Sequence, residues 1–207
     1  MKLTASTVTA LLEAFRSTEP TPGGGSASAL AGAVGVSLLA MVAGLPKPRV
    51  ARDEDLERLR AAGARCVAIA GLLEELIDRD SAAYDLVVGA FRLPKSTGEE
   101  KAARQAAVER ALQAATEAPL EVMRACVDGI EQGAVVAAFG NRNASSDVQV
   151  GLELLGAGLR GAKLNVEINL GSLKDQDWVA KARGEADRLA REAGPGIDAA
   201  RARLAAG

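Results

Sequence analysis

Thr21-Pro22-Gly23-Gly24-Gly25-Ser26 lies at the start of a segment, residues 20–46, that contains no charged side chain. A helix of that length can span a bilayer. This segment, however, consists largely of Gly, Ala and other small residues, and no Trp or Tyr lies at its edges. We therefore interpret it as the buried central helix of a soluble bundle, from about Ser26 to Leu45, and expect no membrane partner.

The composition favours helices around this segment as well. Hydrophobic residues make up 48% of the 207 residues, but aromatic residues only 2%. Small and aliphatic side chains must therefore fill the core, and they allow helices to approach one another closely. The length suits one domain over residues 1–207. We predict an all-α fold, a bundle of long helices.

Helical spacing of apolar residues recurs along the chain. Thr97 with Glu100 three residues later has the form of a capping box. We expect Pro119 and the Gly194-Pro195-Gly196 stretch to interrupt helices, because proline lacks the N–H group. Thr4 or Ser6 is the expected cap of the first helix. The predicted helices are residues 4–17, 26–45, 53–91, 97–118, 119–138, 148–170 and 175–193.

Charge and residue content exclude several classes of protein. The formal net charge of −2 includes no basic run, which argues against nucleic acid as a partner. The chain contains no His, which excludes Ser-His-Asp triads, Cys-His pairs and zinc sites with His ligands. Cys66 and Cys126 lie in apolar surroundings and form no paired framework. We expect inert core thiols, no metal, and a reducing, cytoplasmic location.

The glycine-rich stretch has two interpretations. Glycines at a helix start leave backbone N–H groups accessible, and the helix end carries a partial positive charge. The place then suits a carboxylate, a phosphate or a developing oxyanion. A tight turn packed against another helix explains Gly23, Gly24 and Gly25 equally well. The stretch is not a dinucleotide fingerprint, because no strand precedes it.

Asp80 is the second candidate, since it lies on the apolar stripe of the long helix over residues 53–91. Ile77 and Tyr84 are each about one turn away on that stripe. A buried carboxylate is costly unless it is paired, and burial raises its pKa towards that of a useful general base. A salt bridge to a neighbouring helix is the alternative, and from spacing alone it is the favoured one.

Two further groups of polar residues remain open. Lys95, fixed by the turn at Leu93-Pro94, and Arg104 could hold an anionic group or could be ordinary surface residues. Asn141 and Asp147 lie in a stretch rich in turn formers, where helix capping is the strong alternative to ligand binding.

Short motifs containing these residues occur in one order along nearly the whole chain. They are Thr21-Pro22-Gly23-Gly24-Gly25-Ser26-Ala27-Ser28-Ala29, Met41-Val42-Ala43, Asp80-Ser81-Ala82-Ala83-Tyr84, Leu93-Pro94-Lys95-Ser96-Thr97, Glu100-Lys101, Arg104, Gly140-Asn141, Ser146-Asp147 and Asn165-Val166-Glu167-Ile168-Asn169-Leu170. Each motif is weak alone, but the ordered set resembles the cyclodeaminase/cyclohydrolase family of folate enzymes. The chain departs from that family's pattern at Gly44-Leu45-Pro46-Lys47-Pro48-Arg49, where two prolines remove N–H donors.

The resemblance implies a helical bundle that forms a homodimer, with a folate pocket in a cleft near the subunit interface. It makes Asp80 the catalytic acid/base. It also places around the folate, including polyglutamylated forms, a set of substrate-binding residues: Gly23, Gly24, Gly25, Ser26, Lys95, Arg104, Asn141 and Asp147. Within that set, Lys95 or Arg104 would hold the glutamate carboxylates, while the loop N–H groups and Asn141 would orient the reacting bridge or water.

Two reactions follow from the resemblance, and neither needs a metal or redox cofactor. A methenyltetrahydrofolate cyclohydrolase opens the N5–C–N10 bridge with water to give the 10-formyl form. A formiminotetrahydrofolate cyclodeaminase closes the same ring and releases ammonia. We favour the cyclohydrolase, because no formiminotransferase domain shares these 207 residues. A non-catalytic protein that binds folate or a protein partner is the remaining alternative.

Overall fold

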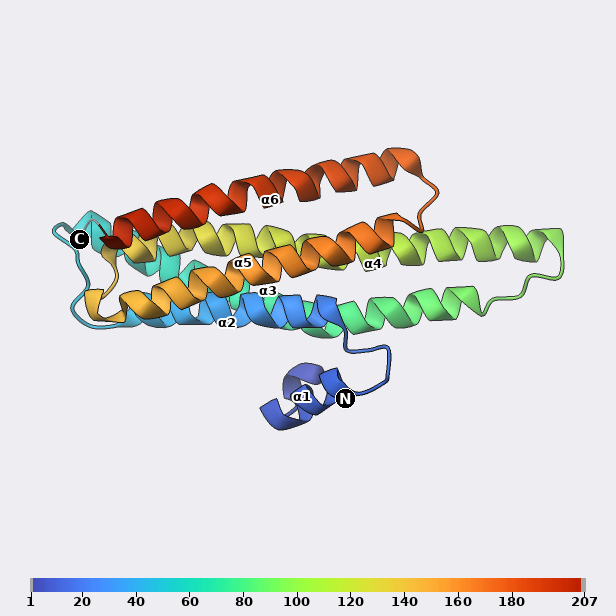
Figure 1. Cartoon of the computed structure of the whole chain (residues 1–207), viewed down its shortest axis with the longest axis horizontal. Helices are drawn as coiled ribbons and strands as arrows, with labels where there is room; N and C mark the ends of the chain where they lie inside the picture. Colours follow the sequence, from blue (N-terminus) through green and yellow to red (C-terminus); the bar gives the residue numbers. More distant parts are fainter. Residues whose placement is uncertain (1, 206–207) are drawn as a thin grey trace.

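The computed structural model describes residues 2–205, and every regular element in that range is a helix. The elements are η1 (Leu3–Ala5), α1 (Val8–Arg16), α2 (Gly24–Gly44), α3 (Asp53–Phe91), α4 (Gly98–Phe139), η2 (Arg142–Ala144), α5 (Ser145–Leu170) and α6 (Gln176–Ala205). The predicted all-α bundle is confirmed. Figure 1 shows that α3 and α4 extend beyond the other helices at one end, while α1 lies apart from the bundle.

The uncharged helix α2 is the centre of the bundle, packed against α3, α4 and α5. Its length and composition would also suit a membrane span, but apolar core helices share both properties. Small residues allow close contact along it. A Cβ added at Gly35 would lie 2.7 Å from the carbonyl oxygen of Gly151 on α5, so the two backbones meet directly there. The predicted central helix is therefore confirmed as a core element.

The order of contacts along α2 gives the directions of its neighbours. From its start to its end, Gly25, Gly32 and Ala43 lie against Asp80, Leu73 and Gly63 of α3. α3 therefore runs antiparallel to α2. This arrangement brings the second half of α3 to the start of α2.

Pro119 does not interrupt a helix, and the prediction of a break there is wrong. α4 continues through it to Phe139. Proline cannot donate to the carbonyl oxygen four residues earlier, which belongs to Ala115. Asn169 of α5 supplies the missing donor, with its Nδ2 2.8 Å from that oxygen. A tertiary hydrogen bond thus repairs the helix.

Other helix boundaries also differ from the predictions. α6 continues through Pro195 instead of ending before it. α2 begins at Gly24, so the glycine-rich stretch forms its first turn and does not merely precede it. Thr7, rather than Thr4 or Ser6, caps α1. The bounds of the helix over residues 53–91 and the capping box of Thr97 with Glu100 are confirmed.

Candidate active site

Asp80 of α3 occupies the amino-terminal end of α2. Gly23, the residue before that helix, has no side chain with which to cap it. The carboxylate of Asp80 takes this place, because its Oδ2 accepts the backbone N–H of Ser26 at 2.9 Å and lies 3.1 Å from the Ser26 hydroxyl. The anion site predicted at this helix start therefore exists, but the protein's own carboxylate fills it.

Gly25 leaves the space in which that carboxylate lies. A Cβ added at Gly25 would be 2.0 Å from Oδ1 of Asp80, well inside any contact distance. Any side chain at this position would displace the carboxylate. The glycine is thus explained by the approach of Asp80, and not by an unusual backbone angle.

The environment of Asp80 shifts its protonation equilibrium. Burial raises the pKa of the carboxyl above its ordinary value, while the hydrogen bonds from Ser26 act in the opposite direction. Within residues 2–205, Asp80 forms no salt bridge. The neighbouring Arg79 pairs with Glu121 of α4, and Asp78 accepts hydrogen bonds from Leu3 and Thr4. The alternative of an interhelical salt bridge is therefore wrong. A half-buried carboxyl with a raised pKa suits general acid–base chemistry.

Asn165 of α5 is a polar residue at this site that the sequence-based assignment of site residues omitted. Its Nδ2 donates to Gly161 of its own helix at 2.9 Å. A Cβ added at Gly24 would lie 3.3 Å from that Nδ2 and 3.7 Å from Oδ1. Asp80 and Asn165 thus flank the first turn of α2 from two different helices. Its motif, Asn165 to Leu170, was the available signal.

A hollow of about 610 Å³ lies beside α3 next to Ser81, the residue after Asp80, although Asp80 itself does not line it. Thr21 and Pro22 line it from the segment before α2, and Ser81 and Asp85 from α3. The Ser81 hydroxyl lies 3.3 Å from that of Ser26, so the hollow reaches the hydrogen bonds around Asp80. It offers a small molecule room beside Ser81, one residue along α3 from Asp80.

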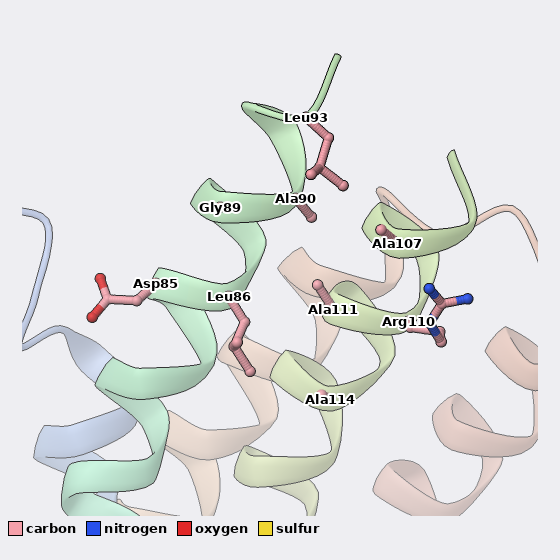
Figure 2. A pocket seen from close by; sticks show the side chains of 9 residues that line it. All are labelled: Asp85, Leu86, Gly89, Ala90, Leu93, Ala107, Arg110, Ala111 and Ala114. Carbon is pink, nitrogen blue, oxygen red and sulfur yellow. The ribbon is translucent and has the colours of Figure 1, made fainter. Parts of the chain in front are cut away.

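A second hollow, of about 440 Å³, lies farther along α3 between that helix and α4 (Figure 2). Small residues from both helices, such as Gly89 and Ala111, form its floor. Figure 2 shows Asp85 pointing away from Arg110, towards the N-terminal segment drawn in blue. This hollow is mainly apolar and does not include Asp80 among its lining residues.

The structure does not bring Lys95 and Arg104 to Asp80. The end of α3 at Phe91 lies roughly 16 Å beyond Asp80, at 1.5 Å per residue, and both residues follow that end. Arg104 donates to the carbonyl oxygen of Phe91 at 3.0 Å and lies over its ring. It thereby stabilises the end of α3. Lys95 is exposed in the connecting turn.

Asn141 and Asp147 lie at the opposite end of α2. This helix is roughly 30 Å long, from 21 residues at about 1.5 Å each. The Asn141 side chain donates to Pro46 at 2.6 Å and accepts the N–H of Asn143 at 2.9 Å. The capping alternative is therefore confirmed for Asn141. Asp147 is half-buried in the first turn of α5.

The glycine-rich residues also differ in what they can touch. Ser26 is fully buried and bonded to Asp80, and Gly25 is buried beneath the same carboxylate. Within this chain Ser26 is therefore enclosed and bonded to Asp80, and its contact with substrate stays a prediction. Gly24 is exposed and Gly23 is partly exposed, so these two remain accessible to a ligand.

The departure from the family pattern at residues 44–49 has a structural explanation. Arg49 donates from its guanidinium to the carbonyl oxygens of Ala137 and Ala138, both at 3.1 Å. Its N–H donates to Phe139 at 2.8 Å. The loop thereby caps the carboxyl end of α4, where helix carbonyls lack partners. Within residues 2–205, no group of three His, Cys, Asp or Glu residues is arranged to hold a metal.

Comparisons with known proteins bear on this site. Residues 7–188 match the family model described as formiminotransferase-cyclodeaminase. A methenyltetrahydrofolate cyclohydrolase from Methylorubrum extorquens is 39% identical over 193 residues, which is 91% of this chain and 90% of that protein.

Two further relatives have the cyclodeaminase name. A formimidoyltransferase-cyclodeaminase from Rattus norvegicus is 33% identical over 83% of this chain, which spans only 32% of that protein's length. The crystal structure of a formiminotetrahydrofolate cyclodeaminase from Thermotoga maritima superposes with a TM-score of 0.85 over 98% of this chain and 97% of the other, at 22% identity. The bundle is therefore the fold of that structure.

Proposed function

This chain belongs to the formiminotransferase-cyclodeaminase family, and on that premise we propose that it is a methenyltetrahydrofolate cyclohydrolase. Its role lies in folate one-carbon chemistry, as an enzyme. The 39% identity that extends over 90% of the cyclohydrolase favours hydrolysis over ring closure. Cyclodeaminase activity is the second candidate, supported by the 33% identity to the rat protein.

The observation that carries the chemistry is the half-buried Asp80 carboxylate at the start of α2, without a cationic partner among residues 2–205. The bridge of methenyltetrahydrofolate carries a positive charge, which a carboxylate attracts. The same carboxylate is a suitable base for water. Gly24 and Asn165 lie next to it with exposed or half-exposed polar groups. We place the bridge of the substrate over Asp80, between these two residues.

The proposed hydrolysis of methenyltetrahydrofolate consumes one water molecule and releases one proton. Asp80 takes a proton from water while the water oxygen forms a bond to the bridge carbon. The carbon–N5 bond then breaks, and N5 receives a proton, which the protonated Asp80 can return. The new C=O bond forms as the hydroxyl oxygen loses its proton to solvent. The products are 10-formyltetrahydrofolate and one proton, and Asp80 ends in its starting state.

A turnover assay with both substrates tests this proposal. Purified protein is mixed with methenyltetrahydrofolate, whose absorbance falls on hydrolysis, and separately with formiminotetrahydrofolate, whose closure releases ammonia. We expect accelerated hydrolysis and little ammonia. Ammonia release without accelerated hydrolysis would make cyclodeaminase the better assignment. No change with either substrate, despite a thermal shift with folates, would contradict both activities.

The proposal includes a homodimer, supported by exposed large apolar side chains on α2 and on α5. Val34 and Met41 of α2 are 44% and 43% exposed, and Leu164 and Ile168 of α5 are 67% and 73% exposed. α1 has no buried residue, although its apolar side chains lie on one face. Exposed apolar side chains that gather into a patch commonly mark an interface, and residues 24–44 contain no charge that would oppose association.

A twofold axis crossing α2 would also reunite separated site residues. It would place the start of one α2 beside the end of the other, so that Asp147 of a second copy could approach Asp80. Mixing two inactive variants, Asp80→Asn and Asp147→Ala, tests this arrangement. Random exchange should restore activity at about a quarter of the sites. Two variants that stay inactive after exchange, or a monomer in solution, would refute shared sites.

The proposal also covers the glutamate tail of the substrate and the location of the protein. The substrate includes polyglutamylated folates, whose carboxylates Lys95 or Arg104 would hold at the exposed end of α3 and α4. A reducing, cytoplasmic location agrees with the buried free thiols Cys66 and Cys126, whose pKa values burial raises to about 12. Comparing mono- and polyglutamylated substrates tests the first of these, by a lower KM for the longer tail.

A further inference from the structure

Ser26 makes two contacts with the same oxygen of Asp80. Its backbone N–H is 2.9 Å from Oδ2, and its hydroxyl oxygen is 3.1 Å from Oδ2. Within residues 2–205, every hydrogen bond to Asp80 goes to this oxygen. Ser26 is fully buried, so it acts on the carboxylate and not on a ligand.

The other oxygen lies in a different environment. Oδ1 packs against Gly25, 2.0 Å from the position of an added Cβ, and accepts no hydrogen bond from residues 2–205. Because no fully buried side-chain oxygen in that range lacks a partner, Oδ1 is not fully enclosed by the protein. We propose that Ser26 is a positioning residue that holds Oδ2 and leaves Oδ1 as the oxygen that exchanges a proton with substrate. This inference rests on the proposed function, because it assigns the two oxygens of its acid/base.

The Ser26 hydroxyl has a second acceptor, which allows the charge of Asp80 to change. Its oxygen is 2.8 Å from the carbonyl oxygen of Ile77, and one hydroxyl has one proton to donate. When Asp80 is ionised, that proton can point to Oδ2. When Asp80 is protonated, it can turn to Ile77, so neither state leaves a buried hydroxyl unpaired.

Within residues 2–205, no charged group pairs with Asp80, and Ser26 is its direct hydrogen-bond partner. α2 contains no charged residue. On α3, Asp78 and Arg79 bond elsewhere, the latter to Glu121 of α4.

On the other helices, Glu117 of α4 pairs with Arg124, and Lys163 of α5 pairs with Glu167 and Asp187. Asn165 of α5, near Gly24, is neutral. Tyr84 follows Asp80 by one turn on α3, and Lys2 and Asp85 line the hollow beside Ser81.

The test compares Ser26→Ala with Ser28→Ala in the full-length protein. Ser28 lies on the same helix, is nearly as buried, and donates to the carbonyl oxygen of Gly24 at 2.7 Å, away from Asp80. Loss of a hydrogen bond to a charged group should lower kcat about 10- to 100-fold. It should move the limb of the pH–rate profile governed by Asp80 about one unit higher. KM should change less than about twofold, and Ser28→Ala should match the wild type.

A direct titration of the Asp80 carboxyl carbon by NMR separates this inference from the proposed function. Its midpoint should rise in Ser26→Ala and stay unchanged in Ser28→Ala, whether or not the protein turns over methenyltetrahydrofolate. Equal midpoints in all three proteins would overturn the role of Ser26. A raised midpoint in a protein without turnover would keep that role and reject the cyclohydrolase.

A second variant covers the case in which Ser26→Ala does not fold. Ser26→Cys preserves the shape of the side chain and replaces the hydroxyl with a thiol, which is a weaker hydrogen-bond donor. We expect a smaller rise of the same midpoint and a smaller loss of kcat. An unchanged midpoint in a folded Ser26→Cys, with a wild-type pH–rate profile, would contradict the proposal.

Discussion

The two ends of α2 use polar residues in opposite ways. At the carboxyl-terminal end of α2, Asn141 caps the following turn and donates a hydrogen bond to the carbonyl oxygen of Pro46. Arg49 donates to the last carbonyl oxygens of α4. Asn141 and Arg49 there each meet a partner of suitable chemistry. At its start, Asp80 brings a carboxylate into a half-buried place where burial raises its pKa and no cation compensates among residues 2–205. Asn141 and Arg49 are satisfied at one end, whereas a half-buried carboxylate without a cationic partner lies at the other.

This contrast distinguishes residues that only cap a helix from a residue whose surroundings suit acid–base chemistry, although both are polar residues at helix ends. Asp80 does cap α2 by accepting the N–H of Ser26. A carboxylate that only caps a helix, however, is best placed in contact with water, where its ionisation costs little free energy. The cost of burying Asp80 is the feature that a cap does not require. Variants at the two ends should therefore differ in whether activity or stability changes.

The largest effect should come from Asp80→Asn. Removal of a general acid/base typically lowers turnover 10²- to 10⁴-fold, so we expect about a 1,000-fold lower kcat. The free energy of unfolding at neutral pH should stay equal or rise, because the amide oxygen still accepts from Ser26 without the cost of a buried charge. Hydrolysis rates and urea denaturation measure the two quantities.

Asp128→Asn is the control for that change, since Asp128 pairs with Arg65 on the other side of the bundle. It should keep wild-type turnover. A destabilised Asp80→Asn protein with normal turnover per folded molecule would reverse the comparison and make Asp80 a cap only.

Gly25→Ala should produce the next largest effect. The added methyl group would force Oδ1 of Asp80 to move from 2.0 Å to a normal contact distance. A displacement of this order can lower the rate about 100-fold. Gly71→Ala is the matched control, since an added Cβ there meets no atom within 4 Å, and it should stabilise α3 by up to about 1 kcal/mol. Near-normal turnover in Gly25→Ala would show that Asp80 need not lie where it does.

Arg49→Ala should affect the opposite end of α2, with a smaller result of the other kind. Loss of its hydrogen bonds to Ala137 and Ala138 should lower the free energy of unfolding by about 1–2 kcal/mol. Turnover per folded molecule should change less than about twofold. Arg16→Ala, which removes an exposed bond within α1, should cost no more than about 0.5 kcal/mol. A loss of turnover like that of Asp80→Asn would contradict the purely structural role of Arg49.

The smallest effect should be a pH dependence of stability. The pKa of Asp80 is raised in the folded state, so the folded protein binds this proton more tightly than the unfolded chain. The associated stability is present below the unfolded pKa and is lost as pH rises through the folded pKa. The advantage of Asp80→Asn over wild type in urea denaturation should therefore grow with pH across that window. A constant difference would mean that burial does not shift this carboxyl.

Much of the fold followed from local features of the chain. The uncharged stretch 20–46, the apolar spacing of residues 53–91 and the Thr97 capping box each predicted an element that the structure contains. Pro119 was misjudged because its compensation comes from Asn169, fifty residues later in the chain. Local rules describe the lost N–H of proline but have no information on a donor from another helix.

The all-α bundle, its central helix and the candidacy of Asp80 follow from the amino-acid sequence, because periodicity, charge and motif order can be read along the chain. The position of Asp80 at the start of α2, its contact with Ser26, and the helix-end contacts of Asn141 and Arg104 appear only in the folded bundle. The partner of a hydrogen-bonding group depends on which helix packs against it. Which helices meet is a property of the folded bundle.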